Sequence, residues 1–257
     1  MRVARTRTFA TLALLAILFS PSAVAAAQGM PGGVPHTTTM DMGGKIRVFA
    51  LADLLEYVPS GTGSLRADAI GWVGGDYNRL YGRLDGEQHF KGPGGETAVD
   101  LLYGRLITPF WTALVGGRVE FRALGTSQRS TRGLLAVGFE GMSTYFFVVE
   151  PTLYVSNKGE VSGRFVTAVD LLFTQRLVLE PRVEVNFAVQ RVPEFGVGSG
   201  INDVELGARM RYEIRREFAP YFGLRYFRRT GATAGLARSM GETVSEAGLV
   251  AGIRMWR

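Results

Sequence analysis

The chain has 257 residues, of which 34 are glycine and none is cysteine. This glycine content is nearly twice the usual share and favours strands and tight turns over a helical bundle. The lack of cysteine excludes disulfides, zinc–thiolate sites and a thiol nucleophile. The formal net charge is +6. Without Arg2, Arg5 and Arg7, which precede an apolar run, the charge is about +3, and this argues against a nucleic-acid partner.

The first 27 residues have the three parts of a secretory signal peptide. MRVARTR is basic, FATLALLAILFS is apolar, and residues 22–27 are the small residues that a signal peptidase accepts. A membrane anchor is the alternative, but the apolar run is short for a span of about 20 residues. We therefore expect residues 1–27 to direct the chain out of the cytoplasm. Residues 28–44, QGMPGGVPHTTTMDMGG, have too few bulky apolar side chains to fold alone, which predicts a flexible tail.

From Ile46 onward the chain consists of twelve runs of about ten residues, bounded by turn-forming residues. They lie near 46–57, 66–74, 77–87, 96–107, 111–122, 132–141, 145–155, 161–173, 177–190, 202–214, 218–229 and 244–256. Many alternate polar and apolar side chains, as LEPRVEVNFAVQRV (179–192) does. Because neighbouring side chains of a strand point to opposite faces, each such run is predicted to be a strand with one apolar and one polar face.

Links between the runs alternate between short and long. Four links after odd-numbered runs are long: GEQHFKGPGG (86–95), RALGTSQRST (122–131), RVPEFGVGSGI (191–201) and RTGATAGLARSMGET (229–243). Tight turns at one end and longer loops at the other are typical of an up-and-down outer-membrane barrel, and aromatic residues flank many of the turns. The sequence predicts an all-β, antiparallel transmembrane barrel of about 12 strands, with a secreted soluble β protein as the alternative.

Charged residues on the polar faces are expected to line the barrel interior. The candidates are Asp100, Glu120, Glu140, Glu150, Asp170, Arg182, Glu184, Glu205, Arg209 and Glu246. One interpretation is a structural network of arginine–carboxylate pairs, and the other is a route that guides a cation. We favour the network, because carboxylates opposite guanidinium groups make a poor site for a soft metal.

Catalysis has little support in this sequence, and we expect the protein not to be an enzyme. Only two histidines are present, His36 in the tail and His89 in a predicted outer loop. A lone loop histidine is more often solvated than catalytic, so no catalytic residue is assigned.

Several longer stretches together resemble the copper resistance protein B family. They are GWVGGDYNRLYGRLDGE (71–87), DLLYGRLITPFW (100–111), LLAVGFEGMSTYFFVVEPTLYVSNKGEVSGRF (134–165), LLFTQRLVLEPRVEVN (171–186), VGSGINDVELGARMRYEIRREFAPYFGLRY (197–226) and GATAGLARSMGETVSEAGLVAGIRMW (231–256). The resemblance implies an outer-membrane barrel of a Gram-negative copper-resistance system. It also implies that the barrel works with a periplasmic multicopper oxidase and copper carriers.

The chain departs from the family pattern at both ends. Family members commonly carry a longer Met- and His-rich segment before the barrel, and this chain keeps only Met30, His36, Met40 and Met42 there. Thioethers suit Cu(I) and imidazole suits either copper state, so these four are candidate copper ligands; the alternative is a linker without ligands. The last residue is Arg257, whereas such barrels usually end on an aromatic residue, here Trp256.

We therefore expect a signal peptide (1–27), a periplasmic tail (28–44) and an outer-membrane barrel (45–257) that is monomeric and embedded in outer-membrane lipid. Its expected function is copper resistance, by binding copper ions or passing them between periplasm and exterior. A general small-solute porin or a structural barrel with little copper binding is the alternative.

Overall fold

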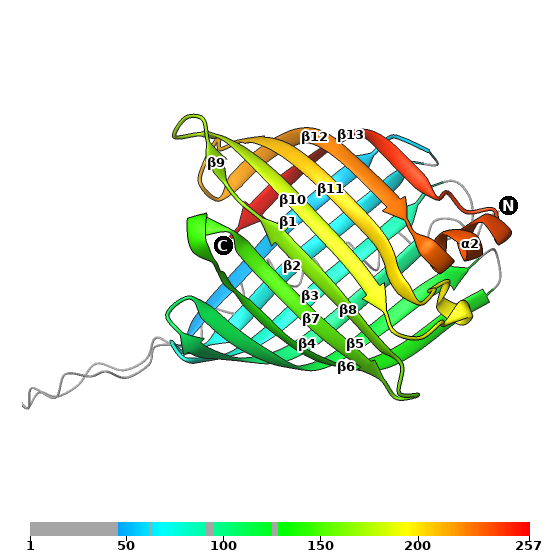
Figure 1. Cartoon of the computed structure of the whole chain (residues 1–257). Helices are drawn as coiled ribbons and strands as arrows, with labels where there is room; N and C mark the ends of the chain where they lie inside the picture. The colour runs from blue at the N-terminus through cyan, green and yellow to red at the C-terminus, as the bar shows by residue number, and fades with distance from the viewer. Residues whose placement is uncertain (1–45, 62, 91–94, 125–127) are drawn as a thin grey trace, which may run out of the picture.

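The computed structural model describes residues 46–61, 63–90, 95–124 and 128–257. Within these ranges, twelve long strands run antiparallel to their neighbours, and the last pairs with the first, so the sheet closes into a barrel (Figure 1). The strands are β1 (Arg47–Val58), β2 (Ser64–Gly74), β3 (Asn78–His89), β4 (Gly95–Thr108), β5 (Trp111–Leu124), β6 (Gln128–Met142), β7 (Val148–Ser156), β8 (Val161–Ala168) with a short continuation β9 (Leu171–Leu172), β10 (Leu177–Ala188), β11 (Gly200–Tyr212), β12 (Phe218–Arg229) and β13 (Ser245–Trp256). The predicted up-and-down barrel is confirmed.

One predicted strand is interrupted. The run 161–173 forms β8 and β9, which both pair with β10 and are separated by Val169 and Asp170. The break lies opposite Pro181, whose carbonyl accepts a hydrogen bond of 3.2 Å from the Val169 amide. Proline has no N–H to return to the neighbouring strand, so the ladder cannot continue there.

Two of the four loops predicted to be long are shorter than predicted. Strand β3 continues to His89 and β4 begins at Gly95, so five of the ten residues of GEQHFKGPGG lie in strands. In the same way β5 continues to Leu124 and β6 begins at Gln128. His89 accordingly lies at the end of a strand and not in an outer loop. The turn-forming residues of these segments concealed how far the strands extend.

The two remaining long loops contain short helices. The 3-10 helix η4 (Pro193–Phe195) lies between β10 and β11, and the helix α2 (Gly231–Ser239) lies between β12 and β13. Helix α2 buries Ala234, Leu236 and Ala237, and the hydroxyl of Thr233 accepts a hydrogen bond of 2.9 Å from the Gly198 amide. A third short helix, η3 (Thr144–Phe146), forms the turn between β6 and β7. No helix in the described ranges is long and apolar enough to cross a membrane.

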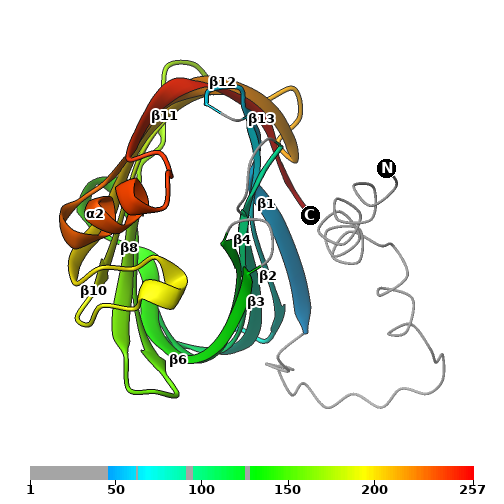
Figure 2. The same ribbon diagram turned by 90° about the vertical axis from the view of Figure 1, so that its right-hand side faces the viewer.

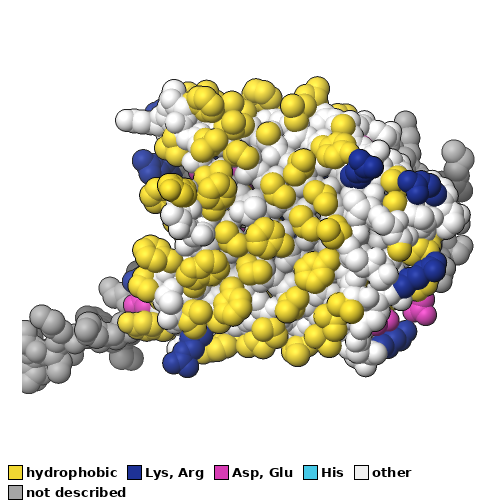
Figure 3. Space-filling view, in the orientation of Figure 1, with side chains coloured by type: hydrophobic (Ala, Val, Ile, Leu, Met, Phe, Trp, Pro, Cys, Tyr) yellow, Lys and Arg dark blue, Asp and Glu magenta, His cyan; other side chains and the backbone are white. Residues whose placement is uncertain are grey.

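The two faces of the sheet differ in chemistry, as the alternation predicted. Figure 3 shows apolar side chains across the outer face that is turned to the viewer. Phe222, Leu224 and Leu249 are among the exposed apolar residues of the barrel. Charged residues such as Arg182 and Glu184 are buried on the inner face. Part of the inner face is also apolar, where Tyr81, Leu102 and Leu114 pack together with neighbours from β6 and β7. The interior therefore combines an apolar wall with a charged one.

We refer to the two ends of the barrel by their elements. The α2 end carries α2 and the loops after β1, β3, β5, β7 and β10, and the terminal end holds the start of β1 and the end of β13 (Figures 1 and 2). At the terminal end the ring of Phe49 stacks on Trp72 at 5.8 Å and lies 6.3 Å from Trp256. The Trp256 indole N–H donates to the carbonyl oxygen of Arg216 at 2.6 Å.

Candidate functional site

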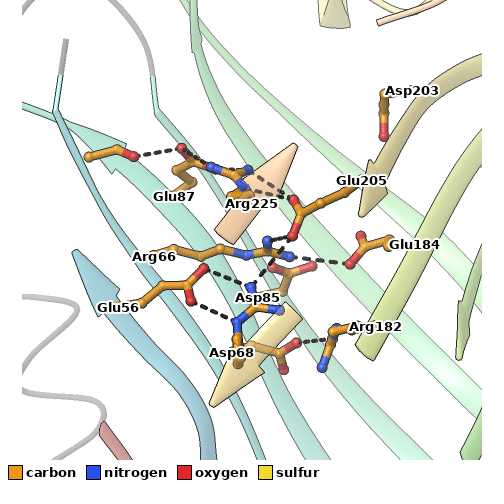
Figure 4. A network of polar contacts seen from close by, with 12 residues as sticks. Glu56, Arg66, Asp68, Asp85, Glu87, Arg182, Glu184, Asp203, Glu205 and Arg225 are labelled. Carbon is orange, nitrogen blue, oxygen red and sulfur yellow. Dashed lines mark hydrogen bonds and ion pairs between the residues drawn. The ribbon is translucent and has the colours of Figure 1, made fainter. Parts of the chain in front are cut away.

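The centre of the barrel is filled by ion pairs between opposite walls. Glu56 of β1 is fully buried and accepts two hydrogen bonds of 2.9 Å from Arg209 of β11, as well as one of 3.2 Å from the Tyr221 hydroxyl. Beside this pair, Glu205 accepts hydrogen bonds from Arg66 and from Arg225 (Figure 4). Such bidentate and bridged contacts hold long side chains in fixed positions across the lumen.

A second group of pairs links β1 and β2 to β8 and β10. Arg182 donates to Asp53 and to Asp68, at 2.8 Å each. Glu184 accepts from Arg164 at 2.8 Å and from Arg66 at 3.2 Å. Because Arg66 bonds to both Glu184 and Glu205, the two groups form one connected network (Figure 4).

The other predicted interior carboxylates also have partners. Arg118 lies 3.3 Å from Asp100 and 2.8 Å from Glu120, and Arg83 lies 2.8 Å from Glu140 and 3.5 Å from Glu150. Asp170, in the break between β8 and β9, pairs with Arg211. Glu246 differs in having a neutral partner, because it accepts a hydrogen bond of 2.7 Å from the Ser60 hydroxyl. The structure thus connects nine of the ten predicted residues to opposite charges and the tenth to a hydroxyl.

Several members of the network are absent from the predicted set. Asp53, Glu56, Arg66 and Asp68 lie on β1 and β2. The pairing of these strands shifts between Ala52 and Leu54, so that simple alternation fails along β1. The position of Arg66 could have been found from the sequence, because Arg66 and Asp68 are two residues apart and therefore lie on the same face of β2. Its partner Glu205 is 139 residues away, so no local pattern indicates that the two side chains pair.

A cavity of about 340 Å³ lies at the α2 end of the barrel. Strand residues such as Asp85, Glu87 and Arg118 line it, and so do Met240 and Glu242 from the segment after α2. Its lining holds nine carboxylates and seven arginines. Toward the middle of the barrel the side chains become nearly inaccessible, with Arg66 5% and Arg209 2% exposed. The cavity is therefore an acidic vestibule that ends at the central network.

Metal ligands are sparse in the described part of the chain. There, no three His, Cys, Asp or Glu side chains are grouped so that they could hold a metal ion. The candidate ligands Met30, His36, Met40 and Met42 lie outside the described residues. The interior carboxylates are engaged by arginines, so the network as it stands holds the strands together and offers no preformed copper site.

Comparison with known proteins gives consistent matches over the barrel. A family model described as "Copper resistance protein B precursor" matches residues 46–257. The Escherichia coli protein "Copper resistance protein B" is 38% identical over 212 residues, covering 82% of this chain and 70% of that protein. A "Copper resistance protein B homolog" from Pseudomonas syringae pv. tomato is 37% identical over the same shares of the two chains.

Among solved structures, the NanC porin is similar with a TM-score of 0.50 and 13% identity, covering 81% of this chain and 99% of that chain. At this level of identity, the similarity supports the barrel fold and nothing further.

Proposed function

The chain belongs to the copper resistance protein B family, and on that basis we propose that it is an outer-membrane barrel that binds copper ions or passes them between periplasm and exterior. The family match over residues 46–257, which include all the described strands, carries this proposal. The fold supports it, because a closed barrel satisfies every backbone group within the membrane. With an even number of strands, both ends of the chain would lie in the periplasm and α2 outside.

The vestibule supports a role in handling cations. Its surplus of carboxylates over arginines would raise the local concentration of copper ions. The central network then limits movement, since Arg66, Arg182 and Arg209 are buried and paired. A copper ion would pass only if some of these side chains moved aside. No catalytic step belongs to this proposal.

The tail would supply the soft ligands that the central network of arginines and carboxylates lacks. We propose that Met30, His36, Met40 and Met42 gather around a copper ion on the periplasmic side. From there the ion would be exchanged with periplasmic copper carriers and a multicopper oxidase. The barrel itself would act as a monomer in outer-membrane lipid.

Copper tolerance of a deletion strain tests the proposed function. We expect deletion of the gene to change growth across a copper series, and we expect the full-length gene on a plasmid to restore wild-type growth. Growth across a zinc series is the control and should be unchanged. Equal growth of the deletion and wild-type strains at every copper concentration would favour the alternative, a structural barrel or small-solute porin without a copper role.

Titration with Cu(I) tests the tail ligands separately. The protein beginning at Gln28 is expected to bind Cu(I), and a variant with Met30→Leu, Met40→Leu, Met42→Leu and His36→Ala is expected to lose that binding because the soft ligands are gone. A protein beginning at Lys45 should behave like the variant. Equal and negligible uptake by all three proteins would contradict a ligand role for the tail and leave the barrel's role open to the deletion test.

A further inference from the structure

Three exposed arginines lie at the α2 end outside the interior network. They are Arg191 in the loop after β10, Arg228 near the end of β12 and Arg238 in α2. Among the residues that the structure describes, none of them makes a side-chain ion pair or hydrogen bond. Figure 3 shows basic side chains at both ends of the face turned to the viewer, several of them at the α2 end beyond the apolar surface. We call these three residues the rim arginines.

Two other basic residues at the α2 end, Arg229 and Lys158, are paired with carboxylates. Arg229, next to Arg228, pairs with Glu242 at 2.8 Å. Lys158, in the turn after β7, pairs with Glu194 at 3.3 Å. Since these carboxylates are already paired, the rim arginines keep an uncompensated positive charge at exposed positions of the α2 end. Arginine is suited to bind phosphate there, because its planar guanidinium donates two parallel hydrogen bonds to neighbouring oxygens.

An apolar strip continues from Arg228 along the same face of β12. Tyr226, Leu224 and Phe222 follow at intervals of two residues, with 36%, 61% and 66% of their surfaces exposed. At a rise of about 3.3 Å per residue, this strip extends roughly 20 Å from the arginine. A cation at one end of such a strip matches an amphiphile with an anionic headgroup and long acyl chains.

We propose that the rim arginines bind the phosphate groups of a phosphorylated glycolipid of the outer leaflet, with its acyl chains along Phe222 and Leu224. The α2 end would then contact lipid headgroups, as the proposed orientation of the barrel requires. This interaction is independent of copper, so the copper experiments and the lipid experiment can fail separately.

Native mass spectrometry of the full mature chain in detergent tests the proposal with lipid A, which carries two phosphates. The variant R191Q/R228Q/R238Q is expected to retain at least tenfold less lipid A than the wild type. The matched control is R105Q/R176Q/R216Q, which removes the same charge from exposed positions at the terminal end and should retain lipid A as the wild type does. A gel shift on heating verifies that each variant is folded.

Two further binding measurements identify which part of lipid A the protein recognises. Dephosphorylated lipid A should bind the wild type as weakly as lipid A binds the rim variant. Inorganic phosphate at millimolar concentration should leave lipid A bound, because the apolar strip contributes as well. Retention of lipid A by the rim variant at the wild-type level, equal binding of the dephosphorylated lipid, or full displacement by free phosphate would each overturn the proposal.

Discussion

Replacing Arg209 with methionine is expected to lower the free energy of unfolding of the barrel by about 3–5 kcal/mol, because Glu56 would remain as a buried charge without its main partner. Glu56 is 0% exposed, and both of its carboxylate oxygens accept hydrogen bonds from Arg209. Of the side chains that the structure describes, the Tyr221 hydroxyl would still donate to it. Unfolding by guanidinium in detergent micelles, followed by tryptophan fluorescence, measures the change.

A second variant tests whether the lost stability comes from the unpaired charge of Glu56 or from general damage to the interior. Combining Arg209→Met with Glu56→Gln removes both charges and leaves an acceptor for Tyr221, so most of the lost stability should return. Lys158→Met, which breaks the exposed pair with Glu194, should cost less than about 1 kcal/mol. An unchanged midpoint for Arg209→Met alone would show that the central pair does not contribute to stability.

Lipid vesicles containing the wild-type protein are expected to take up small sugars no faster than vesicles without protein. Barrels with 16–18 strands leave an aqueous channel, whereas here the twelve strands enclose a lumen that Glu56, Arg66 and Arg209 cross. Vesicle swelling in sugar solutions measures the uptake. Rapid uptake by the wild type would support the small-solute porin and contradict a closed centre.

The double variant Arg66→Ala/Glu205→Ala should increase that uptake several-fold over the wild type. It removes two large side chains from the centre, while Glu184 keeps Arg164 and Arg225 keeps Glu87 as partners. Lys158→Ala with Glu194→Ala is the matched control, since it removes an exposed pair at the surface and should leave uptake unchanged. If both double variants behave like the wild type, another part of the interior closes the lumen.

The barrel was predictable from sequence because its signal is local. Alternation along LEPRVEVNFAVQRV correctly placed Arg182 and Glu184 inside, and the strand count followed from repeated runs and turns. Helix α2 was missed because its nine residues were assigned to the long link RTGATAGLARSMGET. Thr230 before GATAGLARS was a usable signal for a helix start.

The pairing of charges was not predictable in the same way. The partners Glu56 and Arg209 are 153 residues apart, and they meet only because the closed barrel brings opposite walls together. A shift in pairing between Ala52 and Leu54 also hides the inward position of Glu56 from simple alternation. The proposed copper ligands of the tail lie outside the described residues and stay a prediction.

Closure of the barrel at β1 and β13 has a consequence for assembly. The ladder from Leu51 to Trp256 joins segments at opposite ends of the described chain, and Trp256 also contacts Phe49 and the carbonyl of Arg216. Such distant pairing is slow to form, because most of the chain must be ordered first. A product cut short before β13 would leave the edges of β1 and β12 unpaired, so we expect closure of the barrel to require β13.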